Sequence, residues 1–298
     1  MSIEELESLR KKARNTLLIG YIGSVILSIV VAIAIGMPQF IFMITVAGIV
    51  ITTIVGGKSS KAFSLAYKQM FVLKSLEAVF TDLVYEPEKG ISYSVIRDTG
   101  MMYMGDRYTS NDYVKGKYKN INVEQADVHI EEEHETTDSD GNTTTTWVTI
   151  FRGRWMIFDF NKEFKANIQV SQKGFGNSKV SNWGSKLKYK KVAMEDQDFN
   201  NKFRTYAQDE HEAFYILTPS LMEKIKKITG EVKGKMLFCF VDDKLHIGIY
   251  NNKDSFEHGV FTKVDETKAV EDVTKDVKVI TNFIDELSLD NDLFKKGN

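Results

Sequence analysis

The amino-acid sequence predicts an α+β protein in which an N-terminal two-helix transmembrane hairpin precedes a cytosolic, antiparallel β-rich domain with a few packed helices. Two uncharged stretches, residues 16–35 and 40–57, are each close to the ~20 residues that a helix needs to cross a bilayer. Between residues 118 and 195, β-branched and apolar residues alternate with polar ones. After residue 196, apolar residues recur at helical spacing. Strands mixed with a few segregated helices are typical of the α+β class.

Composition sets few limits on function. The chain has 298 residues and a formal net charge of −2, so bulk electrostatics favour neither nucleic acid nor a strongly acidic partner. The single cysteine, Cys239, cannot form an intrachain disulfide and is expected to be a small core residue. We therefore expect no nucleic-acid partner and no cofactor.

The residues that flank the hairpin (16–57) predict its orientation. Gly36 and Pro38 supply the turn between the two spans, and that turn carries no charge. Lys and Arg near a span are retained in the cytoplasm, so both termini are predicted to be cytoplasmic, beginning with a basic N-terminal segment (1–15). The cations are Arg10, Lys11, Lys12 and Arg14 before the first span, and Lys58, Lys61 and Lys68 after the second. The alternative is a buried helical hairpin in a soluble core.

Small residues in the first span suggest close helix packing. Gly20 and Ser24 form a small-xxx-small pattern, with Gly23 beside them, which would let a second helix approach. Neither span holds an ionisable residue that could carry a proton or ion path.

A juxtamembrane amphipathic helix is predicted within residues 58–86, with its periodic part running from Lys58 to Val84. Its apolar residues recur at intervals of three and four, and Pro87 with Gly90 ends it. This helix could pack against the following domain or pair with a second subunit in a homo-oligomer. The apolar positions are Leu65, Ala66, Val72, Leu73, Leu76, Val79, Phe80 and Leu83.

Two further regions complete the predicted domain organisation. Residues 90–195 are predicted to form an antiparallel β-rich region, with a hairpin turning at Asp140 and Gly141. Residues 196–298 are predicted to form an α+β region, with a helix opening at Thr218 and Pro219 and a second hairpin over 235–250. A C-terminal amphipathic helix closes it, with Val270, Val273, Val277, Ile280, Ile284 and Leu287 on one face.

Polar residues concentrate in the hairpin over 124–140. Odd-numbered side chains share one face of a strand, so His129 could lie beside carboxylates such as Glu131 in a metal site. With His134 these residues are candidate metal ligands, although the sequence shows no second cluster that would supply further ligands. A solvated hairpin arm is the default interpretation.

A basic loop over 173–191 suggests contact with an anionic membrane surface. Lysines surround aromatic residues there without an intervening acid, and each cation near an anionic leaflet contributes ~1 kcal/mol. The alternatives are a solvated lysine-rich connection or pairing with the acidic hairpin of another subunit. The candidate residues are Lys173, Lys179, Trp183, Lys186, Lys188, Lys190 and Lys191.

Five motifs resemble an uncharacterised family of bacterial membrane proteins with two N-terminal spans and one cytosolic domain of unknown function. They are Lys115-Gly116-Lys117-Tyr118, Asp140-Gly141-Asn142-Thr143, Thr149-Ile150-Phe151-Arg152-Gly153, Phe158-Asp159-Phe160-Asn161-Lys162 and Tyr215-Ile216-Leu217-Thr218-Pro219. The resemblance covers most of residues 60–290. It implies this architecture and a multi-pass location in the bacterial inner (cytoplasmic) membrane, and it supplies no catalytic residue.

The sequence therefore favours a membrane-anchored cytosolic interaction or scaffold module that contacts a protein partner or the anionic inner leaflet. The alternatives are a membrane-bound metal-dependent hydrolase using His129, Glu131 and His134, and an accessory subunit of a membrane complex. No nucleophile motif identifies an enzyme.

Overall fold

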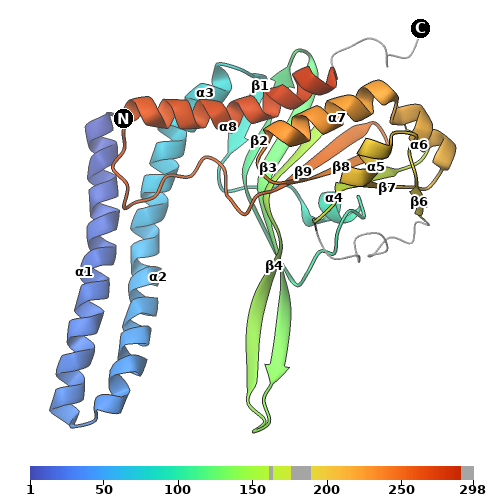
Figure 1. Ribbon diagram of the computed structural model, residues 1–298. Helices are drawn as coiled ribbons and strands as arrows, with labels where there is room; N and C mark the ends of the chain where they lie inside the picture. Colours follow the sequence, from blue (N-terminus) through green and yellow to red (C-terminus); the bar gives the residue numbers. More distant parts are fainter. Residues whose placement is uncertain (161–163, 176–188, 290–298) are drawn as a thin grey trace. The chain divides into compact units, whose positions relative to one another are not determined.

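The computed structural model describes residues 1–160, 164–175 and 189–289. The chain divides into two compact units. The first contains residues 1–75 and 256–274, and the second contains residues 76–255 and the chain from residue 275 onward. Figure 1 labels their helices and strands.

Two long helices make up most of the first unit. Helix α1 (Ile3–Ile35) starts at a capping box, in which the side chains of Ser2 and Glu5 accept from each other's backbone N–H at 3.2 and 2.8 Å. It ends at Gly36, whose φ of 71° lies in the left-handed region that favours glycine. The elements that follow are a 3-10 turn (Pro38–Phe40), α2 (Ile41–Tyr67), a π-helical turn (Lys68–Val72) and α3 (Leu73–Glu77).

Small residues bring α1 and α2 together. A Cβ on Gly20 would lie 2.3 Å from the Thr52 side chain, and one on Gly48 would lie 2.6 Å from Ser24. Gly23 has nothing within 4 Å of its equivalent position. The small-residue pattern at Gly20 and Ser24 therefore faces the second helix of the same hairpin.

The outer faces of both helices carry aliphatic side chains. The helices over Ile3–Ile35 and Pro38–Glu77 are long and apolar enough to cross a membrane. Only 17% and 6% of their most apolar windows is buried, whereas the core helix of a soluble protein is mostly buried. The exposed residues include Ile19, Ile22, Ile26, Ile33, Phe42, Ile51 and Ile54.

A strap, defined as residues 256–264, joins the N-terminal part of α1 to the C-terminal part of α2. Glu257 forms an ion pair with the buried Lys68, and the ring of His258 stacks on Tyr67 with 5.0 Å between centroids. On α1, Arg10 donates to the carbonyl of residue 260 at 3.0 Å. Arg10 also bonds the carboxylate of Glu7 and holds its pKa at about 2. Two of the cations that predict the orientation, Arg10 and Lys68, are therefore paired inside this unit.

Nine strands within the described residues form one sheet in the second unit, and every neighbouring pair is antiparallel, as the sequence predicts. The order is β1-β2-β3-β4-β9-β8-β5-β7-β6. The strands are β1 (Thr81–Glu86), β2 (Arg107–Tyr118), β3 (Ile121–Thr137), β4 (Thr143–Asp159), β5 (Ile168–Gln172), β6 (Lys190–Val192), β7 (Phe203–Ala207), β8 (Lys235–Val241) and β9 (Lys244–Tyr250).

Helices lie on both faces of this sheet (Figure 1). One face is covered by α7 (Pro219–Glu231) and the second half of α8 (Glu266–Leu287), where Phe283 packs on Phe158 of β4. The opposite face is covered by residues 91–104, which include α4 (Tyr93–Arg97). The remaining helices are α5 (Gln197–Lys202) and α6 (Glu210–Ile216).

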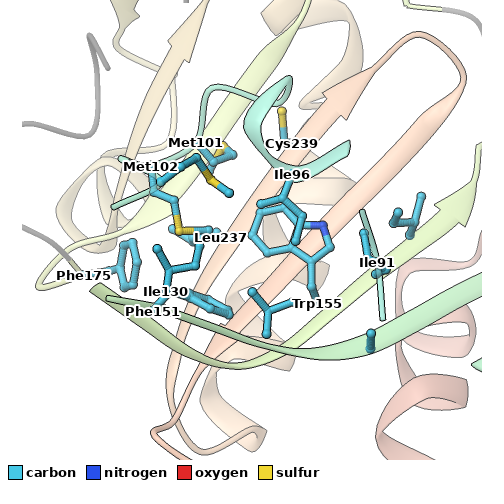
Figure 2. Close-up of a cluster of buried hydrophobic side chains, with 14 residues drawn as sticks. Ile91, Ile96, Met101, Met102, Ile130, Phe151, Trp155, Phe175, Leu237 and Cys239 are labelled. Atoms are coloured by element: carbon cyan, nitrogen blue, oxygen red, sulfur yellow. The ribbon is translucent and has the colours of Figure 1, made fainter. Parts of the chain in front are cut away.

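The core beneath residues 91–104 combines methionines with aromatic rings (Figure 2). Phe151 and Trp155 of β4 meet at 5.8 Å between ring centroids. Cys239 is fully buried there, as expected, and its burial raises the pKa of the thiol. On β3, Ala126 belongs to this face while Val123 belongs to the other, so the interrupted alternation in the sequence reflects two buried faces.

One predicted boundary is wrong. The helix expected from Lys58 to Val84 ends at Glu77, and β1 (Thr81–Glu86) follows because it pairs with β2, a long-range contact that periodicity does not show. The regions expected over 90–195 and 196–298 both contribute strands to one sheet, because β5 and β6 share it with β7, β8 and β9. The helix at Thr218, the hairpin over 235–250 and the C-terminal helix are confirmed.

Candidate functional site

A two-stranded ribbon of exposed, mostly polar residues extends from the sheet of the second unit (Figure 1). Pairing of β3 with β2 stops at Glu131, and pairing of β4 with β9 stops at Gly153. Beyond these points, residues 132–137 and 143–148 pair with one another and with no other strand in the described ranges. We call residues 132–148 the arm.

The sequence at the arm's tip specifies a tight turn. The carboxylate of Asp138 accepts from the backbone N–H groups of Asp140 and Asn142, at 3.0 and 2.8 Å. A hydrogen bond from the Asn142 side chain, together with these backbone donors, lowers the pKa of Asp138. Gly141 has a φ of 84°, which suits glycine. The predicted turn is therefore present, and the threonine-rich strand after it pairs back along β3.

The arm is strongly acidic. It carries Glu132, Glu133, Glu135, Asp138 and Asp140, and its sequence has no Lys or Arg. The strand over 143–148 is an open edge that presents unpaired backbone groups to other chains, whereas on the other strand the backbone N–H of Glu133 donates to Asp106 at 2.8 Å. The charge of the arm therefore selects partners of the opposite sign and disfavours pairing with a second copy of itself.

A cation–π contact anchors the arm at its base. The guanidinium of Arg107 lies 3.7 Å from the centre of the Trp147 ring and 3.2 Å from a carboxylate oxygen of Glu131. Trp147 is therefore held by β2 although more than a third of it is exposed. This contact was not predicted from the sequence, because Arg107 lies in a strand that the pattern does not reveal.

The structure brings only part of the sequence-predicted metal cluster together. His129 Nε2 lies 3.7 Å from Glu131 Oε1 and 3.2 Å from Thr149 Oγ1. His134 instead contacts Glu132, at 3.0 Å, on the opposite face of the ribbon. Within the described ranges no group of three His, Cys, Asp or Glu side chains is placed to hold a metal ion.

The basic loop is described only at its two ends. Lys173, Lys190 and Lys191 are exposed. Lys179, Trp183, Lys186 and Lys188 lie outside the described residues. Phe175, which the sequence groups with this loop, is buried against Phe151 and Tyr250.

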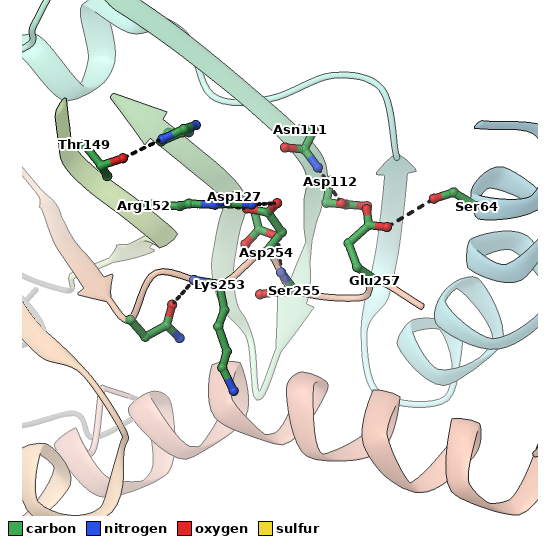
Figure 3. A network of polar contacts seen from close by, with 12 residues as sticks. Ser64, Asn111, Asp112, Asp127, Thr149, Arg152, Lys253, Asp254, Ser255 and Glu257 are labelled. Atoms are coloured by element: carbon green, nitrogen blue, oxygen red, sulfur yellow. Dashed lines mark hydrogen bonds and ion pairs between the residues drawn. The ribbon is translucent and has the colours of Figure 1, made fainter. Parts of the chain in front are cut away.

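Sequence reasoning missed a buried polar network near the base of the arm (Figure 3). Asp127 belongs to the cluster interpreted as solvated, yet it is fully buried and accepts from the backbone N–H of Ser255. Arg154 donates to the hydroxyl of Ser255 at 3.0 Å. Asp112, also buried, accepts from Tyr85 and Asn111, each at 2.7 Å.

Burial controls the charge of this network. Desolvation raises the pKa of Asp127 to about 7; nearby Arg154 opposes this change and Asp112 adds to it. One oxygen of Asp127, Oδ1, has no hydrogen-bond partner within the described residues. The sequence signal for this site is weak: Asp127 stands between the apolar Ala126 and Val128, and alternation places it on the face opposite to theirs without showing that this face is also buried.

Comparisons with known proteins define the family context of part of the chain. Residues 149–289 match a family described as "Protein of unknown function (DUF3137)". This range begins within β4 and ends just after α8, and it contains three of the five motifs that suggested the resemblance. The expected similarity to a family of unknown function is thus confirmed over this range, and it assigns no activity.

Two other comparisons complete this context. No curated protein sequence matches the chain. A solved structure, "crystal structure of the mycobacterial trehalose monomycolate transport factor A, TtfA", is similar with a TM-score of 0.41 and 10% sequence identity, over 76% of this chain and 94% of that one. A similarity at this level transfers neither a fold nor a role.

Proposed function

We propose that the protein is a non-enzymatic interaction module, anchored in the bacterial inner membrane by α1 and α2, that presents the arm to a basic protein partner. The observation that carries the anchoring is the exposed aliphatic surface of both helices. Such a surface is stable in lipid, whereas a soluble protein rarely exposes one of this size. The distribution of cations supports cytoplasmic termini, because Lys11, Lys12 and Lys58 are exposed and the turn between the helices has no charge.

Membrane anchoring and orientation have a direct test. Membranes of cells that produce the full chain are washed with alkaline carbonate, which removes peripheral proteins and leaves membrane-spanning ones. A reporter fused after Asn298 that is active only in the cytoplasm checks the orientation. The proposal requires retention in the pellet and an active reporter; release by the wash, or an inactive reporter made in normal amounts, contradicts it.

The arm supports the choice of a basic protein partner. Its outer strand over 143–148 offers open backbone donors and acceptors, and an added strand of a partner would satisfy them. The carboxylates of the neighbouring strand attract Lys and Arg during approach. Both features are exposed, so a partner would not need to displace other parts of the described chain.

Site-specific photo-crosslinking in cells tests the arm. A photoreactive residue at Thr145 should capture a discrete protein, and the same residue at exposed Tyr215 should not. Neutralising the arm should reduce capture at least ~tenfold, since several charge contacts are lost together. The neutralised residues are Glu132, Glu133 and Glu135, each changed to Gln. The matched control replaces Glu195, Asp198 and Glu210 by their amides. Equal capture by the neutralised and control variants would refute this role for the arm.

Contact of the basic loop with the anionic inner leaflet is a second part of the proposal. The exposed Lys190 and Lys191 support it, because each cation near such a surface contributes ~1 kcal/mol. Vesicle flotation of a fragment over residues 60–298, compared with a form bearing glutamate at Lys186, Lys188, Lys190 and Lys191, is the test. Identical flotation with anionic vesicles excludes the contact.

A further inference from the structure

A pocket of about 330 Å³ lies in the second unit, away from the arm. It is formed where β2, β3, β4 and β9 run side by side, because Lys115 is paired with Glu124, Glu124 with Ile157, and Ile157 with His246. Direct partners in adjacent strands project to the same face of a sheet. Val95 of α4 adds an apolar wall. The volume is at the lower end of the range for small-molecule sites.

The polar group deepest in this pocket is His246, which is only 6% exposed. The indole N–H of Trp155 donates to His246 Nδ1 at 3.3 Å. Because an indole nitrogen is only a donor, Nδ1 must be the acceptor, and the proton of the neutral ring is on Nε2. Nε2 makes no hydrogen bond within the described residues, which leaves one N–H donor for a molecule in the pocket.

This donor stays neutral at physiological pH. Burial, assisted by the nearby charge of Lys244 and opposed by that of Glu124, lowers the pKa of His246 to about 4. A neutral N–H binds an oxygen of a ligand without adding a buried charge to the site.

The rim of the pocket carries charges of both signs. Lys115 Nζ lies 2.9 Å from a carboxylate oxygen of Glu124, and Lys244 forms an ion pair with Asp159. Tyr113 orients Glu124 through a 2.9 Å hydrogen bond. A ligand with a single charge would pair with one member of an ion pair and leave the other member without its partner. A ligand that carries both signs can exchange partners with both ion pairs.

From these observations we propose that the pocket binds a small zwitterion of the amino-acid class, whose carboxylate accepts from His246 Nε2–H and from a rim lysine. Its ammonium group pairs with Glu124 or Asp159, and its side chain contacts Val95 and Ile157. This site is independent of the arm, so it stands or fails separately from the proposed partner interaction.

The test uses the full chain in lipid nanodiscs and titrates each of the free L-amino acids by calorimetry. At least one should bind, and acetate and methylamine should each bind at least ~tenfold more weakly, because each satisfies only one sign of the rim. Absence of binding by every amino acid, or equal binding of acetate, overturns the proposal.

Two variants localise the binding. Val95→Trp fills the pocket from its wall and should weaken binding at least ~tenfold, whereas Val148→Trp places the same ring at an exposed position of the arm and should not. If Val95→Trp does not fold, His246→Gln is the second test. Its amide keeps an acceptor for Trp155 and an N–H donor for the ligand, so this variant should retain binding. Unchanged affinity in a folded Val95→Trp protein, or loss of binding in a folded His246→Gln protein, contradicts the assignment.

Discussion

Replacing Asp127 by Asn should change how the stability of the second unit depends on pH. Asp127 is fully buried, and its pKa rises from 3.8 to about 7 in the folded protein. At a pH between these two pKa values, Asp127 is protonated in the folded state and ionised in the unfolded state. The free energy of unfolding therefore falls as pH rises through this window, and the stabilisation is fully present only below it.

The size of this effect follows from the width of the window. The free energy of unfolding changes by about 1.4 kcal/mol for each unit by which a pKa differs between the folded and unfolded states. The shift of the Asp127 pKa from 3.8 to about 7 therefore corresponds to about 4 kcal/mol. The amide of the Asp127→Asn variant would bind no proton in this range, and its side-chain oxygen could still accept from Ser255 N–H. The variant should therefore gain stability relative to the wild type as pH rises, by an amount that approaches this value.

Urea unfolding of the full chain in detergent micelles, followed by tryptophan fluorescence, measures this difference between about pH 4.5 and about pH 7.5. The exposed Asp198→Asn variant is the control for general charge effects. A wild-type-to-variant difference that is constant over this range would refute the reasoning. It would show that Arg154 keeps Asp127 ionised throughout.

Three further predictions concern other sites. Gly20→Leu should lower the melting temperature in nanodiscs because its side chain would overlap α2, whereas Gly23→Leu, which faces open space, should leave it unchanged; equal effects would contradict the packing. Nitrogen-15 NMR should show His246 as the neutral Nε2–H form at about pH 5.5, and an imidazolium signal there would exclude this tautomer. Glu257→Ala should destabilise the first unit by about 1–3 kcal/mol by removing the carboxylate that pairs with the buried Lys68, and Lys68→Met should reverse part of this loss in a thermal-unfolding cycle.

Much of the fold could be predicted because local patterns agree with it. The uncharged stretches correspond to α1 and α2, and alternation predicts the hairpin of β3 and β4. Thr218 caps α7 by accepting from Leu221 N–H at 3.3 Å, as the Thr-Pro pair predicts. These features depend on residues close in sequence, which is the information that periodicity and capping rules use.

The missed features depend on distant contacts. β1 reads as the end of a helix because Val79, Phe80 and Leu83 keep a helical spacing, and only pairing with β2 makes this segment a strand. The pocket was missed for the same reason: Lys115 and His246 are far apart in the sequence and meet only through the order of four strands. Asp127 looked solvated because the acidic residues that follow it in the sequence belong to the exposed arm.

The hairpin has a consequence for how this protein could join a larger assembly. The glycine and hydroxyl side chains that allow close approach, such as Gly20, Gly48 and Ser24, are already occupied by contact between α1 and α2. Under the proposed anchoring, lipid would meet mainly branched aliphatic groups, such as Ile22 and Ile26, and the open position at Gly23. Recruitment would then depend mainly on the water-exposed parts of the chain, and the anchor would limit diffusion to two dimensions.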